Sequence, residues 1–107
     1  MNNFINEIFK EYGDELNIVY GSNEYDLLIR PEGSSGSSSI YCRFQECTVG
    51  NLLADAFKSS GNSDTAFVNG GAVRNSLIKG NLTRSQVMEV APFFNNLIVK
   101  KFQDNVF

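Results

Sequence analysis

Apolar residues recur at helical spacing in two long stretches of the chain. The first group is Phe4, Ile5, Ile8, Phe9 and Tyr12. Because Gly13 follows, where a C-terminal cap is common, this spacing predicts an amphipathic helix over residues 3–12. The second group keeps the i, i+3, i+4, i+7, i+8 pattern of one helix face: Val49, Leu52, Leu53, Ala56 and Phe57. A helix is predicted there, with Thr48 as its cap and Gly61 as its stop.

A third, shorter helix is predicted from the residues at its N-terminal end. Residues 83–86 read Thr-Arg-Ser-Gln, the capping-box form. In this form a threonine and a glutamine three residues later satisfy each other's backbone N–H groups. Val87, Val90 and Ala91 would form the apolar face, and Pro92 is expected to end the helix because proline cannot continue it.

Five short runs of β-branched, aromatic or other apolar residues predict strands. They are residues 16–20, 25–30, 40–44, 65–68 and 97–102. The run GSSGSSS at 33–39 has nothing to pack and is predicted to be a flexible loop. We therefore expect an α/β (α+β) fold with helices packed on a mixed sheet. The loop is expected to separate an interdomain-like part, residues 1–39, from a second part, residues 40–107.

Length and charge restrict the functions that such a fold could perform. With 107 residues the chain fits one domain with one modest core. A net charge of −3 and a pI near 4.8 argue against an extended nucleic-acid partner, which needs clustered Lys and Arg, while a single small anion stays compatible. No apolar run reaches the roughly 18 residues of a membrane span. The N-terminus has no basic start followed by an apolar core, so no signal peptide is expected in this chain.

The chain contains no histidine, which removes several kinds of active site. Ser-His-Asp and Cys-His nucleophile pairs both need an imidazole, and so does a His-bearing metal site. The twelve Asp and Glu residues are scattered without a calcium-loop spacing, and two cysteines alone cannot hold zinc. We therefore expect no catalytic residues and no metal ligands in this chain.

The two cysteines lie in the motif CRFQEC, as Cys42 and Cys47. Their spacing leaves two interpretations open. In a reducing cytosol they would be two unrelated thiols, and outside the cell they would form a short-loop disulfide. The main effect of closing so short a loop would be to fix the direction of Arg43 and Phe44.

The hexapeptide NGGAVR, residues 69–74, follows the predicted strand 65–68. Asn-Gly-Gly is a common turn sequence, and a turn without a ligand is the simpler interpretation. The alternative is a ligand site, because Gly70 and Gly71 carry no side chains that would block approach to the backbone. Arg74 would add a planar fork of donors suited to phosphate oxygens, and Asn69 an amide that both donates and accepts.

Three blocks in series resemble a known family. They are CRFQECTVGNLLADAF, TAFVNGGAVR and GNLTRSQVMEVAPFFNNLIV. Together they resemble the first half of the C-terminal domain of 5'-nucleotidases, a family that includes ecto-5'-nucleotidases, apyrases and UDP-sugar hydrolases. The resemblance covers roughly residues 40–102, and residues 1–39 match only loosely.

The resemblance implies a set of substrate contacts. Arg43 matches the arginine of the family's Cys-Arg motif, and Asn69 and Arg74 match the ends of its Asn-Gly-Gly-x-x-Arg motif. All three would contact the ribose and phosphate region of a nucleotide. Phe93, in APFF, matches a ring that stacks on the nucleobase. Taken singly, Phe93 would more often be a core residue, and each arginine a surface ion-pair residue.

The resemblance also implies a disulfide between Cys42 and Cys47, an extracellular or cell-surface location, and two divalent metals, usually zinc, in a separate metallophosphoesterase domain. The metal-binding domain and the later half of the C-terminal domain do not match any part of this chain. That later half carries the second aromatic ring of the base site. Ala72 stands where the family has a third glycine, a change that an ordinary backbone conformation tolerates.

These expectations lead to two functional hypotheses. The first is the nucleotide-recognition portion of a 5'-nucleotidase-like hydrolase in nucleotide catabolism, without its own catalytic residues. The second is a truncated, non-catalytic member that binds a small ligand or a protein. The sequon Asn81-Leu82-Thr83 agrees with a secreted or surface location.

Overall fold

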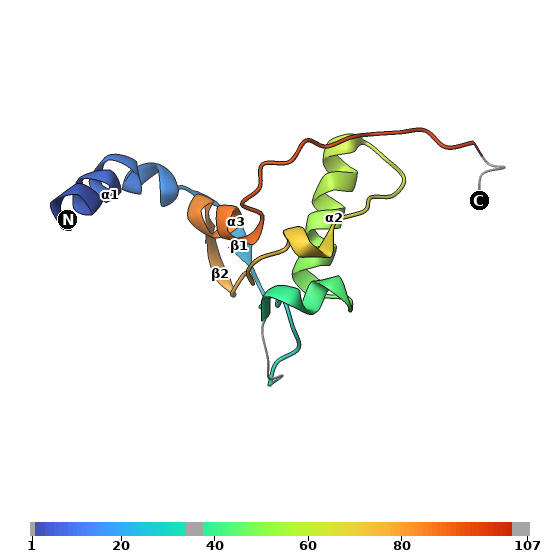
Figure 1. The fold of residues 1–107 in the computed structure, drawn as a ribbon, viewed down its shortest axis with the longest axis horizontal. Coiled ribbons are helices and arrows are strands. Elements are labelled where there is room, and N and C mark those ends of the chain that lie inside the picture. The colour runs from blue at the N-terminus through green and yellow to red at the C-terminus, as the bar shows by residue number, and fades with distance from the viewer. Residues whose placement is uncertain (1, 34–37, 104–107) are drawn as a thin grey trace.

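The structure, a computed structural model, describes residues 2–33 and 38–103. Its elements occur in the order α1 (Asn2–Leu16), β1 (Val19–Asn23), η1 (Ser38–Arg43), α2 (Thr48–Gly61), η2 (Gly70–Ala72), β2 (Gly80–Thr83) and α3 (Arg84–Val90), where η marks a 3-10 helix. In Figure 1, α1 projects from one end, and the C-terminal segment passes the end of α2 at the other. Helices and a small sheet together confirm the expected α/β class.

Helix α1 is longer than the sequence indicates. It continues through Gly13 to Leu16, and the Asn17 N–H donates to the Gly13 carbonyl at 3.0 Å. A capping glycine adopts a positive φ, whereas the positive-φ glycines of the described chain are Gly33 and Gly80. The prediction that Gly13 ends this helix was therefore wrong. The strand expected at residues 16–20 begins only at Val19.

The sheet consists of β1 and β2, which pair antiparallel. Val19 lies opposite Thr83 and Asn23 opposite Gly80, with an irregularity between Val19 and Gly21. The strand expected at 25–30 is reduced to a single bridge, in which Leu27 and Leu77 exchange backbone hydrogen bonds of 2.8 and 2.9 Å. The sheet therefore joins the N-terminal segment to the segment just before α3.

Three other predicted strands are wrong. Residues 40–44 lie in η1 and the turn after it, while 65–68 and 97–102 have no strand pairing within the described chain. The reason for η1 is geometric: an extended chain from Cys42 to Cys47 would span roughly 17 Å, but their Cα atoms are 5.4 Å apart. The other two runs have strand-forming side chains, but a strand also needs a ladder of backbone hydrogen bonds to a partner strand, and none is formed there in the described residues. Of the predicted loop 33–39, residues 34–37 lie outside the described residues, and Ser38 and Ser39 belong to η1.

Helix α2 has the predicted bounds but different capping. The N-cap position is Cys47, with no side-chain cap. The Thr48 hydroxyl instead accepts from the Leu28 N–H at 2.8 Å and donates to the Leu28 carbonyl at 3.1 Å. Gly61 is the last helical residue, and Asn62 adopts the left-handed conformation with φ 46°. Thr48 therefore ties α2 to the 27–30 segment instead of capping the helix.

Helix α3 begins as its sequence predicts. The Thr83 N–H donates to Gln86 Oε1 at 2.8 Å, and Thr83 Oγ1 accepts from the Gln86 N–H at 3.4 Å. This is the complete capping box. The helix ends at Val90, two residues before Pro92, so the predicted stop is confirmed as well.

The buried core is small and draws on distant parts of the chain. Its members are Ile29, Cys47, Val49, Val73, Leu77 and Val90. The molecule extends 60 × 32 × 28 Å, and its radius of gyration is 16.6 Å. A compact domain of this length would have about 13 Å. Consistent with that shape, large apolar side chains stay exposed, among them Phe67, Phe94 and Ile98.

Candidate functional site

The predicted site begins where η1 lies against η2, two short helices that are far apart in sequence. A Cβ atom on Gly70 would overlap the carbonyl oxygen of Cys42 and would lie 2.7 Å from its carbonyl carbon. A Cβ on Gly71 would lie 3.1 Å from Arg43 Nε. Gly70 is therefore needed for this close approach of the two backbones, and Gly71 leaves space for the Arg43 side chain beside the Asn-Gly-Gly turn.

A disulfide between Cys42 and Cys47 fixes the end of η1. It joins η1 to the residue just before α2, and Cys47 belongs to the buried core. Packing around Cys47 is tight, since a Cβ on Gly50 would lie 2.8 Å from its sulfur. Arg43 is thus attached, through the preceding residue, to the buried core.

Asn69 organises the turn that faces Arg43. Its Oδ1 accepts from the Gly71 N–H at 3.0 Å, and its carbonyl accepts from the Ala72 N–H at 2.8 Å. Both bonds are local, so the turn forms from its own sequence. The Asn69 amide nitrogen has no acceptor within the described chain and can donate to a ligand.

Phe93 approaches this turn from the segment after α3. Phe93 is 53% exposed, and the Arg74 guanidinium carbon lies 6.0 Å from the centroid of its ring. Phe94 follows with φ 46°, a left-handed conformation that side-chain-bearing residues rarely adopt. This local reversal of the chain leaves Phe94 78% exposed, while its neighbours Phe93 and Asn95 line a cavity.

That cavity is an open one of about 680 Å³. It is lined by Arg43, Asn69, Gly70, Gly71, Ala72, Phe93 and Asn95. Five of the six predicted substrate residues therefore meet in one place. Arg74 does not line the cavity and lies beside the ring of Phe93 instead. Asn95 was not among the predicted site residues. The sequence feature that could have indicated it is its position two residues after Phe93.

The same stretch of chain matches a family model. Residues 26–103 match the model of the 5'-nucleotidase C-terminal domain. This range includes most of the chain and all of the residues that line the cavity. The chain belongs to the 5'-nucleotidase C-terminal domain family. The expected family membership is thereby confirmed, with a match that begins at residue 26, one residue before Leu27, which bridges to Leu77.

Individual relatives agree with this assignment. The chain is 41% identical over 56 residues to an apyrase of Anopheles gambiae and to an apyrase of Aedes aegypti. It is 40% identical over 53 residues to a 5'-nucleotidase of Vibrio parahaemolyticus. The matched stretches cover 49 to 50% of this chain and 10% of each relative. The chain thus corresponds to a small part of the curated relatives that it matches.

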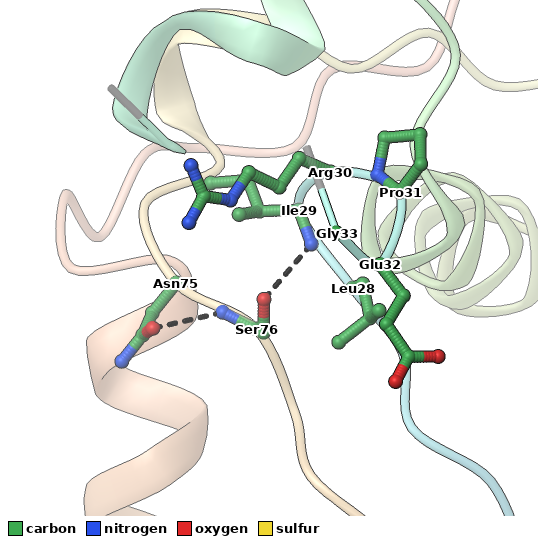
Figure 2. A pocket seen from close by; sticks show the side chains of 8 residues that line it. All are labelled: Leu28, Ile29, Arg30, Pro31, Glu32, Gly33, Asn75 and Ser76. Atoms are coloured by element: carbon green, nitrogen blue, oxygen red, sulfur yellow. Dashed lines mark hydrogen bonds between the residues drawn. The ribbon is translucent and has the colours of Figure 1, made fainter. Parts of the chain in front are cut away.

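A second cavity of this 5'-nucleotidase-type domain lies beside the segment that contains the core residue Ile29. It measures about 330 Å³ and is lined by residues 28–33 together with Asn75 and Ser76. Figure 2 shows the Ser76 hydroxyl receiving the Ile29 N–H, at 2.9 Å, and the Asn75 side-chain oxygen receiving the Ser76 N–H, also at 2.9 Å. The bond between Ile29 and Ser76 anchors the chain just after the NGGAVR segment, and the local bond orients the Asn75 amide.

The divalent metals that the resemblance implies do not fit the residues of this domain. The chain has no histidine, and both of its cysteines are in the disulfide. Within residues 2–33 and 38–103, no three His, Cys, Asp or Glu side chains gather closely enough to hold an ion.

No helix of that part of the chain is both long and apolar enough to cross a bilayer.

Proposed function

We propose that this domain is the nucleotide-recognition portion of a 5'-nucleotidase-like hydrolase, with a nucleoside 5'-monophosphate as its ligand. The observation that carries the proposal is the cavity of about 680 Å³, in which Arg43, the Asn-Gly-Gly turn and Phe93 meet. An arginine guanidinium can bind a phosphate, and a backbone without side chains lets a sugar come close. An aromatic ring can stack on a base.

The roles follow from the position of each group. Phe93 offers a half-exposed ring on which a base can stack whatever its identity. Arg43 belongs to the same lining, beside Gly71, and would bind phosphate oxygens through parallel N–H bonds. Asn69 would donate to the ribose region with the amide nitrogen that its own turn leaves available.

In the intact hydrolase this domain would bind and orient the nucleotide. Two divalent metals, zinc in the usual reading of the family, would activate water for attack on the 5'-phosphate from a separate metallophosphoesterase domain. That domain would be the partner of this chain. Since the residues present do not fit a metal pair, we derive no step through the metals and assign this chain positioning alone.

Calorimetric titration of the purified chain with AMP, adenosine and inorganic phosphate tests the proposal. We expect AMP to bind, with adenosine weaker. The Phe93→Ala variant should lose most of the affinity for both ligands. Phe67→Ala is the matched control, since Phe67 is 86% exposed and does not line the cavity. Failure of AMP to bind the folded wild-type chain would contradict the proposal.

A second candidate function is a non-catalytic module that binds a protein. It is favoured by the exposed apolar side chains of the C-terminal segment, Phe94, Leu97, Ile98, Val99 and Phe102. A monomeric chain with no affinity for AMP or adenosine would favour this second function over the first.

We further propose that the domain acts outside the cell or at its surface. The disulfide persists in oxidising compartments. The sequon residue Asn81 lies exposed in β2, where a glycan could be attached. Expression in the secretory pathway followed by glycosidase treatment tests this: a mobility shift is expected in wild type and not in Asn81→Gln.

A further inference from the structure

Arg74 and Phe93 come from two separate segments that are joined by a backbone hydrogen bond. The Arg74 N–H donates to the Val90 carbonyl at 2.8 Å, at the last residue of α3. Phe93 follows three residues later, and the guanidinium carbon lies 6.0 Å from its ring centroid. Val73 and Val90 beside this bond are buried in the core, whereas Arg74 itself is exposed. A second attachment next to Arg74 would restrain the direction of its side chain further.

Asn75 provides that second attachment. Its Nδ2 donates to Glu89 Oε2 on α3 at 2.9 Å, and its Oδ1 accepts from the Ser76 N–H at 2.9 Å. Both ends of the amide are therefore engaged, and its orientation is determined. Figure 2 shows the Asn75 amide between its bond to Ser76 and the adjacent helix α3.

Glu89 is held in turn by its own helix. Its Oε1 lies 3.4 Å from the Ser85 hydroxyl one turn earlier, a weak contact that favours the side-chain direction seen here. On the other side, the Ser76 hydroxyl accepts from the Ile29 N–H at 2.9 Å, and Ile29 is a core residue. The connection thus extends from α3 through Asn75 to the core.

We propose that Asn75 and Glu89 are positioning residues that hold Arg74 against Phe93. Attachments at two successive residues, 74 and 75, restrain the backbone from which the Arg74 side chain projects. An exposed cation–π contact is weak by itself, so its population depends on such restraint. The functional meaning of this arrangement rests on the proposed function, in which Phe93 binds the base. Arg74 does not line the cavity itself, but from beside this ring it would add positive charge next to the cavity and favour a ligand that carries a phosphate.

Chemical shifts report the Arg74–Phe93 contact without any ligand. Side-chain protons of Arg74 near the face of the ring should be displaced upfield, and Phe93→Leu gives the reference shift without a ring. In Asn75→Ala and in Glu89→Ala we expect the Arg74 shifts to move at least halfway to that reference. Glu89→Gln keeps an acceptor oxygen for Asn75 and should retain most of the wild-type shift.

A matched control exists elsewhere on the surface. Asn51 Nδ2 donates to Glu46 Oε1 at 2.7 Å, the same pairing of an amide with a carboxylate, near α2. Glu46→Ala should leave the Arg74 shifts unchanged. Wild-type Arg74 shifts in both Asn75→Ala and Glu89→Ala would overturn the positioning role.

Ligand selectivity gives the second measurement. Loss of one such hydrogen bond should lower the ratio of AMP affinity to adenosine affinity about threefold, with adenosine binding itself unchanged. Loss of stability alone would weaken both ligands equally. If wild type binds neither ligand, the proposed function fails, while the chemical shifts still decide whether Asn75 and Glu89 position Arg74. If the wild type prefers AMP and both variants keep the wild-type ratio of AMP affinity to adenosine affinity, the inference fails and the proposed function stands.

Discussion

Gly70 packs so closely on Cys42 that any side chain at position 70 would overlap the Cys42 carbonyl oxygen. This contact joins the Asn-Gly-Gly turn to the disulfide-bound end of η1, and it brings Arg43 to the cavity. The neighbouring atom is backbone, which cannot move aside as a flexible side chain would. The glycine therefore has a packing function in addition to its place in a turn.

Gly70→Ala should lower the free energy of unfolding by about 1–3 kcal/mol, the cost typical of overpacking. Gly21→Ala is the control, because a Cβ there meets no atom within 4 Å and Gly21 has no positive φ. It should change the free energy by no more than about 0.5 kcal/mol. Urea unfolding followed by circular dichroism measures both. Equal stability of Gly70→Ala and wild type would contradict the close packing.

The disulfide should stabilise the chain despite its short loop. Removing it in a Cys42→Ser/Cys47→Ser double variant should lower the free energy of unfolding by about 2 kcal/mol, because the unfolded chain can then adopt more conformations. Thermal unfolding with and without dithiothreitol checks the cause. The reductant should lower the midpoint of wild type to that of the double variant and leave the double variant unchanged.

Arg43→Ala should weaken AMP binding by about tenfold to a hundredfold, the range for a hydrogen bond to a charged group. Adenosine, which has no phosphate, should be affected much less. Arg84→Ala is the control, because Arg84 pairs with Glu15 at 4.0 Å and does not line the cavity. Titrations at two salt concentrations should also show weaker AMP binding at high salt in wild type. Equal losses for AMP and adenosine would remove Arg43 from the phosphate position.

Gly13→Ala should stabilise α1, since an alanine in a helix interior is favoured over glycine by about 0.5–1 kcal/mol. The sign is informative because the same substitution at a left-handed cap would be destabilising. Gly33, with φ 77°, provides that comparison, and Gly33→Ala should destabilise the chain. Far-UV circular dichroism during urea unfolding gives the direction of both changes. A loss of helix in Gly13→Ala would contradict the continuous helix.

Features that depend on neighbouring residues could be predicted from the sequence. The capping box of Thr83 and Gln86 forms between groups three residues apart, and the Asn69 turn forms between groups two residues apart. Pro92 ends α3 through its own ring. The bounds of α2 also followed from apolar spacing, although its capping groups did not.

Strands were predicted poorly because a strand depends on a partner that its own residues do not reveal. The runs 65–68 and 97–102 have strand-forming side chains but belong to no strand pair in the described chain. The run 40–44 was redirected by the disulfide, whose Cα separation of 5.4 Å excludes an extended segment.

The sequence by itself determined the chemical groups available to the site: one Asn-Gly-Gly turn, the arginines Arg43 and Arg74, and a Phe after a short helix, with no imidazole to hold a metal. The tertiary structure decided which of these groups meet. It placed Arg43 beside Gly71 and Phe93 at the same cavity, and left Arg74 next to the ring instead. Those meetings depend on contacts between segments many residues apart, and local spacing carries no information about them because they arise only when the core closes.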